Sequence, residues 1–362
     1  MPKKSAWQMV RPALKAITST AEVSDRNLPA RLLANESYLN PSFLLREALQ
    51  QAADLEPNRY WLPEVSTELL AGLSKYSSLP KEFILLGNGA DELIQATMLT
   101  FLQPGDSVIL PWPAYQMYPY LAEVLGVNPV KVSLQADWSL PLEALAQAAS
   151  RHAAPLIILA NPNNPTGNLF PERDLIWLIE HTDSILVVDE AYFEYCGKTA
   201  AHLLQEYDRL IIWRTFSKAF SLAGMRIGYL LAQPQLVAEI YKARLPFNIS
   251  NLSQWLAKAA LEHWPVFERH VRETALERER VREELWKLPG VLVHPSVANF
   301  LLFCTDLPAD HLHLRLYQAG VSVRQVEAAS PLLSHCLRVS IGSRAENDLF
   351  LETMRQALAG PR

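Results

Sequence analysis

The sequence predicts an α/β protein, with a mostly parallel central sheet in a large domain and a second, smaller α+β domain. Three observations predict this class. The chain of 362 residues is longer than one hydrophobic core usually sustains, so two domains are expected. Short apolar runs alternate with amphipathic stretches from Phe83 to Ala232. After Pro265 the pattern changes to one long charged helix followed by short strands, which is typical of a separate α+β unit.

The apolar runs of the large domain are expected to be strands that are covered on both faces. They read FILLG, SVIL, PLIILA, SILVVD, RLIIWR and IGYLLA in chain order. Each run is almost continuously apolar, whereas a strand with one face in water alternates with a period of two. Helical patterns lie between the runs, among them DELIQATMLTFL, PLEALAQAA and PERDLIWLIEH, the last with a proline in its first turn. We expect this domain to span residues 46–264.

The C-terminal part, residues 265–362, is expected to form the small domain. Its first element is the helix VFERHVRETALERERVREELWKL, which ends at Pro289 and Gly290 and whose many charges indicate a solvated face. The strands VLVH, NFLLF, VSVR and CLRVSI follow, with the helix HLHLRLYQAG among them and a last helix near the C-terminus. We expect the N-terminal segment, residues 1–45, to join this domain.

The composition excludes several classes of protein. Hydrophobic residues make up 49% and charged residues 20%, which is typical of an ordered globular chain. The net charge is -5 and no long run of like charge occurs, so no nucleic-acid partner is expected. No stretch of about 18 apolar residues occurs, and the basic N-terminus lacks the apolar core of a signal peptide. Neither membrane association nor export is therefore expected.

The cysteines indicate a reducing compartment. Cys196, Cys304 and Cys336 are odd in number and show no CxxC spacing, so neither a disulfide framework nor a zinc cluster is expected. A cytoplasmic protein without a metal ion is the prediction. His311 and His313 share an HxH spacing, but no carboxylate or cysteine pattern accompanies them, and they are expected to lie on a helix of the small domain.

Polar segments follow four of the predicted strands, at the carboxyl ends where an α/β sheet binds its ligands. In the first, LGNGADELI, a helix opens near Ala90, and the free amides of a helix start suit a phosphate. A dinucleotide is disfavoured, because the next strand, SVILPWPAY, ends without the acidic residue that a dinucleotide fold uses. In the second segment, ANPNNPTG, Asn163 and Asn164 offer amide side chains.

The third and fourth segments add an acid, a phenol and an amine. SILVVDEAYFEY places Asp189 at a strand end and Tyr192 one turn later. RTFSKAFSLAGMRIGY places Lys218 just after an apolar strand, among hydroxyl and guanidinium groups that suit a phosphate. A cofactor with a phosphate, a pyridine nitrogen and an aldehyde would use all of these groups, and pyridoxal phosphate is that cofactor.

The strings NPNNPTG, DEAY and TFSKAFSLAGMRIGY, in this order and spacing, resemble the fold-type-I pyridoxal-phosphate enzymes. Within that class the chain resembles the histidinol-phosphate aminotransferase family, to which the threonine-phosphate decarboxylases of cobalamin synthesis are related. The resemblance extends from Leu33 to Leu349. It implies transfer of an amino group between a small amino donor, either an amino acid or an amino phosphate, and a 2-oxo acid acceptor.

The resemblance also implies a role for each residue around the cofactor ring. Lys218 would form a Schiff base with the cofactor and move the proton of the substrate α-carbon. Asp189 would keep the pyridine nitrogen protonated. Tyr192 and Asn164 would hydrogen-bond the phenolic oxygen of the ring, and Tyr115 would stack on the ring face. The other aromatic residues of that segment are expected to be core packing: Trp112, Tyr118 and Tyr120.

The cofactor phosphate would be held by the backbone at Ala90 and Asp91 together with Ser217 and Arg226, with Thr215 as a further member. Arg226 lies eight residues after Lys218, as the family pattern requires. The resemblance therefore implies that one phosphate site combines helix-start amides with a hydroxyl and a guanidinium group.

Five further positions match the family pattern outside these segments. Tyr60 in NRYWLPE resembles the tyrosine that reaches the cofactor phosphate of the other subunit, which implies a homodimer. Arg338 in CLRVSIG resembles the arginine that binds a substrate carboxylate or phosphate as a fork, and Arg324 in GVSVRQV resembles a second anion-binding arginine. Asn35 and Asn248 match positions of lower specificity, Asn35 on the substrate side.

The departures from the family pattern lie near the substrate. The NENP segment of the family reads Asn35-Glu36-Ser37-Tyr38 here, the preceding TSTAEVSDRNLP lacks a tyrosine, and Tyr60 is followed by Trp61 in place of proline. Three interpretations of the enzyme activity therefore stay open: the aminotransferase named above, an amino acid phosphate decarboxylase and an aromatic amino acid aminotransferase. A transcription regulator on the same fold would need an N-terminal DNA-binding module, and fewer than 35 residues precede the first motif.

Overall fold

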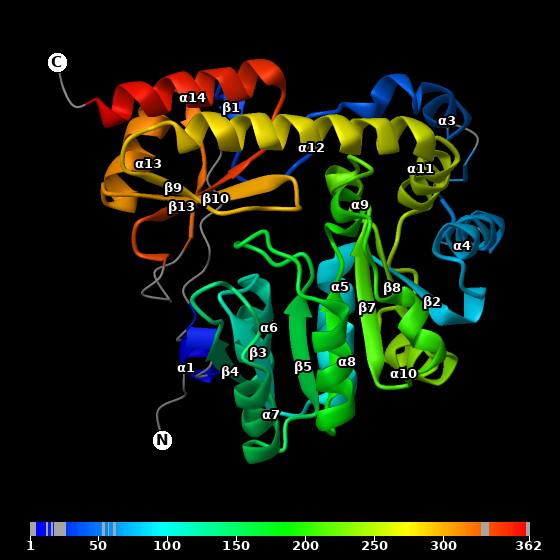
Figure 1. Cartoon of the computed structure of the whole chain (residues 1–362). Coiled ribbons are helices and arrows are strands. Elements are labelled where there is room, and N and C mark those ends of the chain that lie inside the picture. Colours follow the sequence, from blue (N-terminus) through cyan, green and yellow to red (C-terminus); the bar gives the residue numbers. More distant parts are fainter. Residues whose placement is uncertain are drawn as a thin grey trace.

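The computed structural model describes residues 5–11, 14–15, 17, 27–52, 55–56, 58–60, 63–326 and 333–359. Its centre is a seven-stranded sheet with the order β2-β8-β7-β6-β5-β3-β4 (Figure 1). The strands are β2 (Ile84–Gly87), β3 (Ser107–Trp112), β4 (Asn128–Ser133), β5 (Leu156–Ala160), β6 (Ile185–Asp189), β7 (Leu210–Thr215) and β8 (Gly228–Ala232). Only the pairings of β8 with β2 and β7 are antiparallel, so the predicted mostly parallel sheet is confirmed.

All six apolar runs that predict strands form strands of this sheet, and β4 is a strand that the apolar pattern does not predict. It lies at the edge of the sheet, next to β3 alone. Its six residues are all exposed or half-buried. An edge strand of this kind needs no continuous apolar run, so the sequence NPVKVS does not stand out from a loop.

Both faces of the large sheet are buried, as the apolar runs predict. Successive side chains leave a strand on opposite faces. Leu159 and Val188 lie in one apolar core, whereas their neighbours Ile158 and Val187 lie in the other. The first core takes in helices α4 (Pro63–Ser77), α7 (Leu142–Arg151), α8 (Glu172–His181) and α11 (Asn251–Glu262), and the second takes in α5 (Gly89–Phe101), α6 (Met117–Leu125) and α10 (Pro234–Ala243).

A second, antiparallel sheet has the order β12-β13-β10-β9. Its strands are β9 (Val291–Val293), β10 (Phe300–Thr305), β12 (Arg324–Gln325) and β13 (Cys336–Ser340), and it shares an apolar core with α12 (Trp264–Trp286), α13 (Ala309–Gln318) and α14 (Arg344–Leu358). The predicted charged helix is α12, and it buries a residue every three or four positions from Phe267 to Leu285. It extends beyond the small sheet and contacts α9 (Phe193–Cys196) next to the large one (Figure 1).

The N-terminal part of the described chain is attached to the small sheet. Strand β1 (Ala30–Arg31) pairs in parallel with β11 (Val321–Ser322), and the amide of Ser340 donates to the carbonyl of Leu32 at 2.9 Å. The domain division into residues 1–45, 46–264 and 265–362 stays a prediction. The remaining short helices are α1 (Ala6–Met9), α3 (Arg46–Gln51) and 3-10 turns at Pro41–Phe43, Lys81–Phe83, Ala201–Gln205 and Ala223–Met225. None of the described helices is long and apolar enough to cross a membrane.

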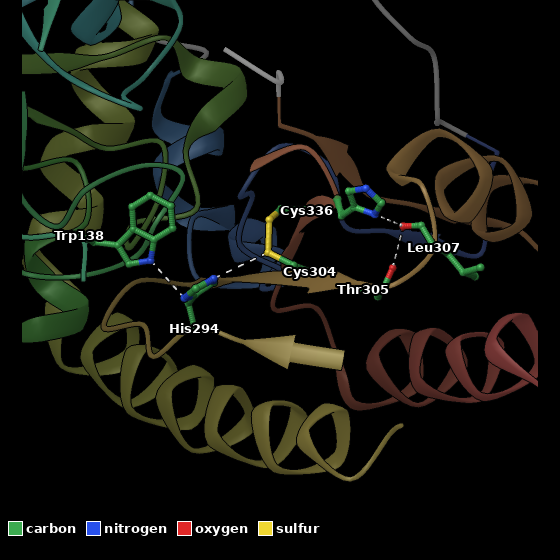
Figure 2. The surroundings of a disulfide bond; sticks show 7 residues. Trp138, His294, Cys304, Thr305, Leu307 and Cys336 are labelled. Atoms are coloured by element: carbon green, nitrogen blue, oxygen red, sulfur yellow. Dashed lines mark hydrogen bonds between the residues drawn. A yellow bond between two sulfur atoms is a disulfide. The ribbon is translucent and has the colours of Figure 1, made fainter. Parts of the chain in front are cut away.

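The expectation that no disulfide forms is wrong. Cys304 and Cys336 are bonded to each other (Figure 2). Cys196 is free. They are 32 residues apart in sequence but face each other across the β10–β13 pair. The number and spacing of cysteines carry no information on which strands become neighbours, which is why the sequence does not reveal this bond.

Candidate active site

The predicted site residues gather at one edge of the large sheet. Asn164 follows β5, Asp189 ends β6 and Thr215 ends β7, and these three strands are parallel neighbours. In the register of β8, Gly228 lies opposite both Gly87 and Thr215. The end of β2, the start of β8 and the end of β7 therefore meet at this edge, and parallel pairing alone brings the segments together.

The start of α5 forms a candidate anion-binding site with Gly228 and Arg226, which we call the anion cradle. Glycine is required at two of its positions, because a side chain there would be too close to its neighbours. Gly89 has a φ of +78°, and a Cβ atom there would lie 2.8 Å from Nη2 of Arg226. A Cβ atom on Gly228 would lie 2.8 Å from the amide nitrogen of Ala90. The guanidinium of Arg226 also pairs with Asp91 at 3.0 Å. Helix-start amides and a guanidinium group thus converge, and such a site binds phosphate.

Two hydroxyl groups complete the cradle. Thr215 Oγ1 donates to Ser217 Oγ at 2.9 Å and accepts from the Ser217 amide at 3.1 Å, and both residues are buried. The predicted phosphate-site residues therefore lie on adjoining segments of the sheet edge. The mutual hydrogen bonds hold the two hydroxyl groups in place next to the loop that carries Arg226.

A buried carboxylate lies at the same edge. Asp189 Oδ2 accepts a hydrogen bond from the hydroxyl of Tyr118 at 2.6 Å, and Oδ1 accepts from the amide of Ala191 at 3.0 Å. Burial raises the pKa of Asp189 to about 6, and the bond from Tyr118 opposes this rise. The carboxylate is thus held by two donors and keeps acceptor capacity for a protonated ring nitrogen.

The interpretation of Tyr118 as core packing is wrong in this respect, because its hydroxyl positions Asp189. The ring is fully buried as expected, but a buried phenol needs a hydrogen-bond partner. Tyr115 stands edge-on to Tyr118, with ring centroids 5.5 Å apart, and its hydroxyl lies 3.5 Å from Oδ1 of Asp91. The spacing of three residues from Tyr115, a predicted site residue, is the signal that could have identified Tyr118 as well.

The amine of Lys218 faces a backbone carbonyl. Its Nζ donates to the oxygen of Ala34 at 2.9 Å. Burial, and next the positive charge of Arg338, lower the pKa of Lys218 to about 8. A substantial neutral fraction near physiological pH is what a nucleophilic amine requires. Ala34 was not predicted, because a backbone acceptor leaves no trace in the choice of side chain.

We define the strap as residues 33–37, which cross the site from the N-terminal side. Asn35 Nδ2 donates to the hydroxyl of Tyr192 at 2.9 Å, and the Asn35 amide donates to Ser340 Oγ at 2.8 Å. Asn299 Nδ2 donates to the carbonyl of Asn35 at 3.0 Å. Asn35 has a φ of 52°, a conformation that asparagine tolerates better than most residues. The strap thus joins Tyr192 to the small sheet.

Arg338 of β13 reaches the site from the small sheet. Its Nη1 donates to Asn164 Oδ1 at 2.6 Å and its Nη2 to the carbonyl of Leu33 at 2.8 Å. Burial lowers its pKa to about 10, so it remains a cation near neutral pH. Within the described residues its Nε has no hydrogen-bond partner although it is buried, which a bound anion would satisfy. Arg324 lies opposite Arg338 on β12 and is exposed.

Two predicted residues lie apart from this cluster. Tyr60 is 81% exposed and stacks on Phe247, with ring centroids 5.2 Å apart. No hydrogen bond joins Tyr60 to another predicted site residue in the described chain. Asn248 donates to the carboxylate of Glu92 on the first turn of α5 and thus supports the helix that forms the cradle.

Comparison with known proteins agrees with this geometry. The chain matches the aminotransferase class I and II family over residues 32–354. Histidinol-phosphate aminotransferase 2 of Nitrosococcus oceani is 37% identical over 358 residues, which cover 98% of this chain and 99% of the relative. The structure of histidinol-phosphate aminotransferase from Sinorhizobium meliloti in complex with pyridoxal-5'-phosphate is 28% identical, with a TM-score of 0.89 over 98% of this chain and 99% of that one.

The same fold also occurs with a different reaction. L-threonine-O-3-phosphate decarboxylase of Porphyromonas gingivalis covers 91% of this chain and all of its own with a TM-score of 0.79, but it is only 21% identical, so it shows the fold alone. The family match and the relative that is 37% identical carry the assignment instead. The predicted fold type is confirmed, and this chain belongs to the aminotransferase class I and II family.

Proposed function

We propose that the protein is a pyridoxal-phosphate-dependent aminotransferase that moves an amino group from histidinol phosphate to a 2-oxo acid in the cytoplasm. The observation that carries the proposal is the amine of Lys218, whose pKa is lowered to about 8, among an anion cradle, a buried carboxylate and a buried arginine. We propose histidinol phosphate as the amino donor because relatives that are 37% and 36% identical are named histidinol-phosphate aminotransferases.

The residues present fit pyridoxal phosphate. A Cβ atom would fill the backbone cradle at Gly89 and Gly228, so these glycines keep room for a phosphate. Ser217, Arg226 and the amides of α5 would hold that phosphate, with Thr215 orienting Ser217. Asp189 would bind the ring nitrogen, Tyr192 and Asn164 the phenolic oxygen, and Tyr115 the ring face. When bound, the cofactor supplies an aldehyde that reacts with amines and a ring that withdraws electrons.

The protein's own groups supply positioning and proton transfer. Lys218 Nζ, partly neutral at physiological pH, accepts the proton from the α-carbon of the amino donor. Arg338 binds the anionic end of the donor through its free N–H groups, which include Nε. Asn35 holds the hydroxyl of Tyr192 in place. The strap and the arginine thus hold the donor while the lysine moves the proton.

Incubation of the purified holoenzyme with histidinol phosphate tests the reaction. We expect the aldehyde form of the cofactor to be consumed and to return on addition of 2-oxoglutarate, with formation of glutamate. Release of carbon dioxide from threonine phosphate, without accumulation of the amine form of the cofactor, would identify a decarboxylase instead. Conversion by aromatic amino acids with no response to histidinol phosphate would support the aromatic aminotransferase.

We also propose that the enzyme is a homodimer in which Tyr60 contacts the cofactor phosphate of the partner subunit. Tyr60 is 81% exposed and stacks on Phe247, which is 58% exposed. Exposed aromatic side chains that contact each other are typical of a protein interface. A second copy of the chain would bury them.

Hybrid dimers test this shared site. Tyr60→Ala and Lys218→Ala proteins, each severely impaired, are unfolded together and refolded as an equal mixture. Random pairing gives about half hybrids, in which one site carries both lesions and the other neither, so about a quarter of wild-type activity should return. A mixture that stays as inactive as its parents, despite verified exchange of chains, would show that Tyr60 serves no neighbouring site.

A further inference from the structure

The disulfide lies between the two central strands of the small sheet. The Thr305 amide donates to the carbonyl of His335 at 3.1 Å, which makes Cys304 and Cys336 a closely spaced pair without hydrogen bonds between their own backbones. Such pairs bring side chains of neighbouring strands together. The two sulfur atoms are therefore brought together by strand register, whether or not they are oxidised (Figure 2).

The cysteine pair shares a sheet face with the anion-binding arginine. Side chains two positions apart on a strand lie on the same face, so Cys336 and Arg338 point the same way from β13. Phe300, Leu302 and Cys304 do so from β10, and Arg338 lies over the ring of Phe300 at 5.4 Å. The disulfide and Arg338 are therefore neighbours on this face of the sheet, so the bond between Cys304 and Cys336 forms or breaks next to Arg338.

The two sulfur atoms differ in their surroundings. Cys336 is 1% exposed, whereas Cys304 is half-buried and lies 3.7 Å from Nε2 of His294. The indole N–H of Trp138 donates to Nδ1 of His294 at 3.1 Å (Figure 2). An indole can only donate, so Nδ1 accepts and the neutral imidazole carries its proton on Nε2, facing Cys304. A hydrogen-bond donor beside a thiol favours the thiolate, so Cys304 is the more reactive thiol when the bond is open.

We propose that Cys304 and Cys336 are a reversible oxidation site for peroxides, with Cys304 as the attacking thiolate and Cys336 as the resolving thiol, and that the bond raises the anion affinity of Arg338. The thiolate of Cys304 attacks one peroxide oxygen, the O–O bond breaks, and a sulfenic acid and hydroxide form. The Cys336 thiol then attacks that sulfur, the S–O bond breaks, and water leaves. Two thiols are oxidised and one hydrogen peroxide is reduced to two waters.

The reverse reaction needs a reductant of the dithiol class. A dithiol attacks the half-buried sulfur of Cys304, forms a mixed disulfide and is itself released as a disulfide, which returns both cysteines to thiols. In a cytoplasmic enzyme, as we propose this one to be, disulfides are usually transient for this reason. The bond adds a covalent link to the hydrogen-bonded pairing of β13 with β10 beside Arg338, and a group held in its binding position loses less freedom when an anion arrives.

Thiol counting on the holoenzyme tests the oxidation site without any substrate. After reduction with dithiothreitol, desalting and unfolding, all three cysteines should be alkylated. After treatment with hydrogen peroxide only Cys196 should react, and dithiothreitol should restore the other two. The Cys336→Ser variant should instead accumulate a sulfenic acid on Cys304 that dimedone traps. His294→Phe should slow the oxidation about tenfold, the effect of one pKa unit on the thiolate fraction.

The matched control is Cys196→Ser, which should leave the oxidation of the other two cysteines unchanged. The proposed oxidation site would be refuted if peroxide treatment consumed no thiols. It would also be refuted if Cys304 were oxidised at an unaltered rate in His294→Phe. Both results come from the wild-type chain or from a single substitution of the half-buried His294, so a misfolded Cys336→Ser variant does not decide the matter.

Inorganic phosphate is the probe for the second half of the proposal. The cofactor fills the cradle at α5 in the holoenzyme, so added phosphate reports on Arg338. We expect about a threefold lower Kd in the oxidised than in the reduced holoenzyme, and no difference between the two forms of Arg338→Lys. Equal Kd values would refute the link to Arg338. Neither readout uses turnover, so failure of the proposed function, seen as no reaction with histidinol phosphate, is a separate result.

Discussion

The site has two sides that are built in different ways. On the cofactor side, Asp189, Thr215 and the start of α5 are placed by the register of one buried sheet. On the proposed substrate side, the strap and Arg338 come from distant parts of the chain and are held by hydrogen bonds, from Arg338 to the carbonyl of Leu33 in the strap and to Asn164 at the sheet edge. Apolar packing fixes the first side, and polar contacts between distant segments fix the second.

This difference indicates which part of the site can change to give a different substrate specificity. A sheet with both faces buried tolerates little movement, so the cofactor groups keep their positions. Hydrogen bonds across the strap can be exchanged without loss of a core. Ser37 and Tyr38 depart from the family pattern. Ser37 is the last residue of the strap, where it contacts His270 and Ser221, and Tyr38 follows it. Variants on the two sides should therefore change different kinetic constants.

The largest effect is expected from Lys218→Ala, since Lys218 carries the amine of the site and its Nζ also donates to Ala34 of the strap. Turnover should fall by a factor on the order of 10⁴, because both the nucleophilic amine and the proton acceptor are lost. The far-ultraviolet circular dichroism should stay that of the wild type, because Lys218 is only half-buried. A borohydride-reducible adduct that persists in this variant would remove Lys218 from its proposed role.

On the cofactor side, Asp189→Asn should lower kcat by about 10² to 10³, because a neutral amide cannot stabilise the charge of a protonated ring nitrogen. KM for histidinol phosphate should change little, since Asp189 lies on the opposite side from Arg338. Tyr118→Phe is the matched milder variant and should cost about tenfold, the loss of one hydrogen bond to a charged group. A large change in KM with an unaltered kcat would break the comparison.

The cofactor side was predictable from the sequence because its residues follow apolar strands directly. Asp189 and Thr215 are the last residues of β6 and β7, so strand order and parallel pairing are enough to bring them together. Tyr118 was missed because a tyrosine in an apolar helix gives the same pattern whether its hydroxyl binds water or a carboxylate. That distinction depends on how α6 is rotated against β6.

The substrate side could be predicted only through the resemblance. Arg338 is placed near Asn164 by contacts across 174 residues, and the carbonyls of Leu33 and Ala34 act through the backbone. The disulfide was missed for the same reason, since the pairing of β10 with β13 decides it. Contacts between distant segments leave no periodic signal in a single sequence.

On the substrate side, Arg338→Lys should raise KM for histidinol phosphate about tenfold, because a point charge replaces a planar fork with several donors. The value of kcat should stay within a few-fold of the wild type if the cofactor side is independent. Arg324→Lys is the control for a conservative change on the neighbouring strand. Unchanged KM for every donor tested in Arg338→Lys would show that the substrate anion is bound elsewhere.

The smallest effect concerns the charge that the substrate side exerts on Lys218. The capture of pyridoxal phosphate by the apoenzyme requires the neutral amine, so its rate should rise with pH through a midpoint of about 8, the pKa of Lys218. The positive charge of Arg338 lowers that pKa and the negative charge of Glu36, in the strap, raises it. Arg338→Met should therefore move the midpoint to higher pH and slow capture at pH 7, whereas Glu36→Gln should move it to lower pH. Opposite shifts in these two variants, with Arg324→Met unshifted, would show that the substrate side tunes the cofactor side through charge alone; equal midpoints in all of them would mean that burial by itself sets the pKa of Lys218.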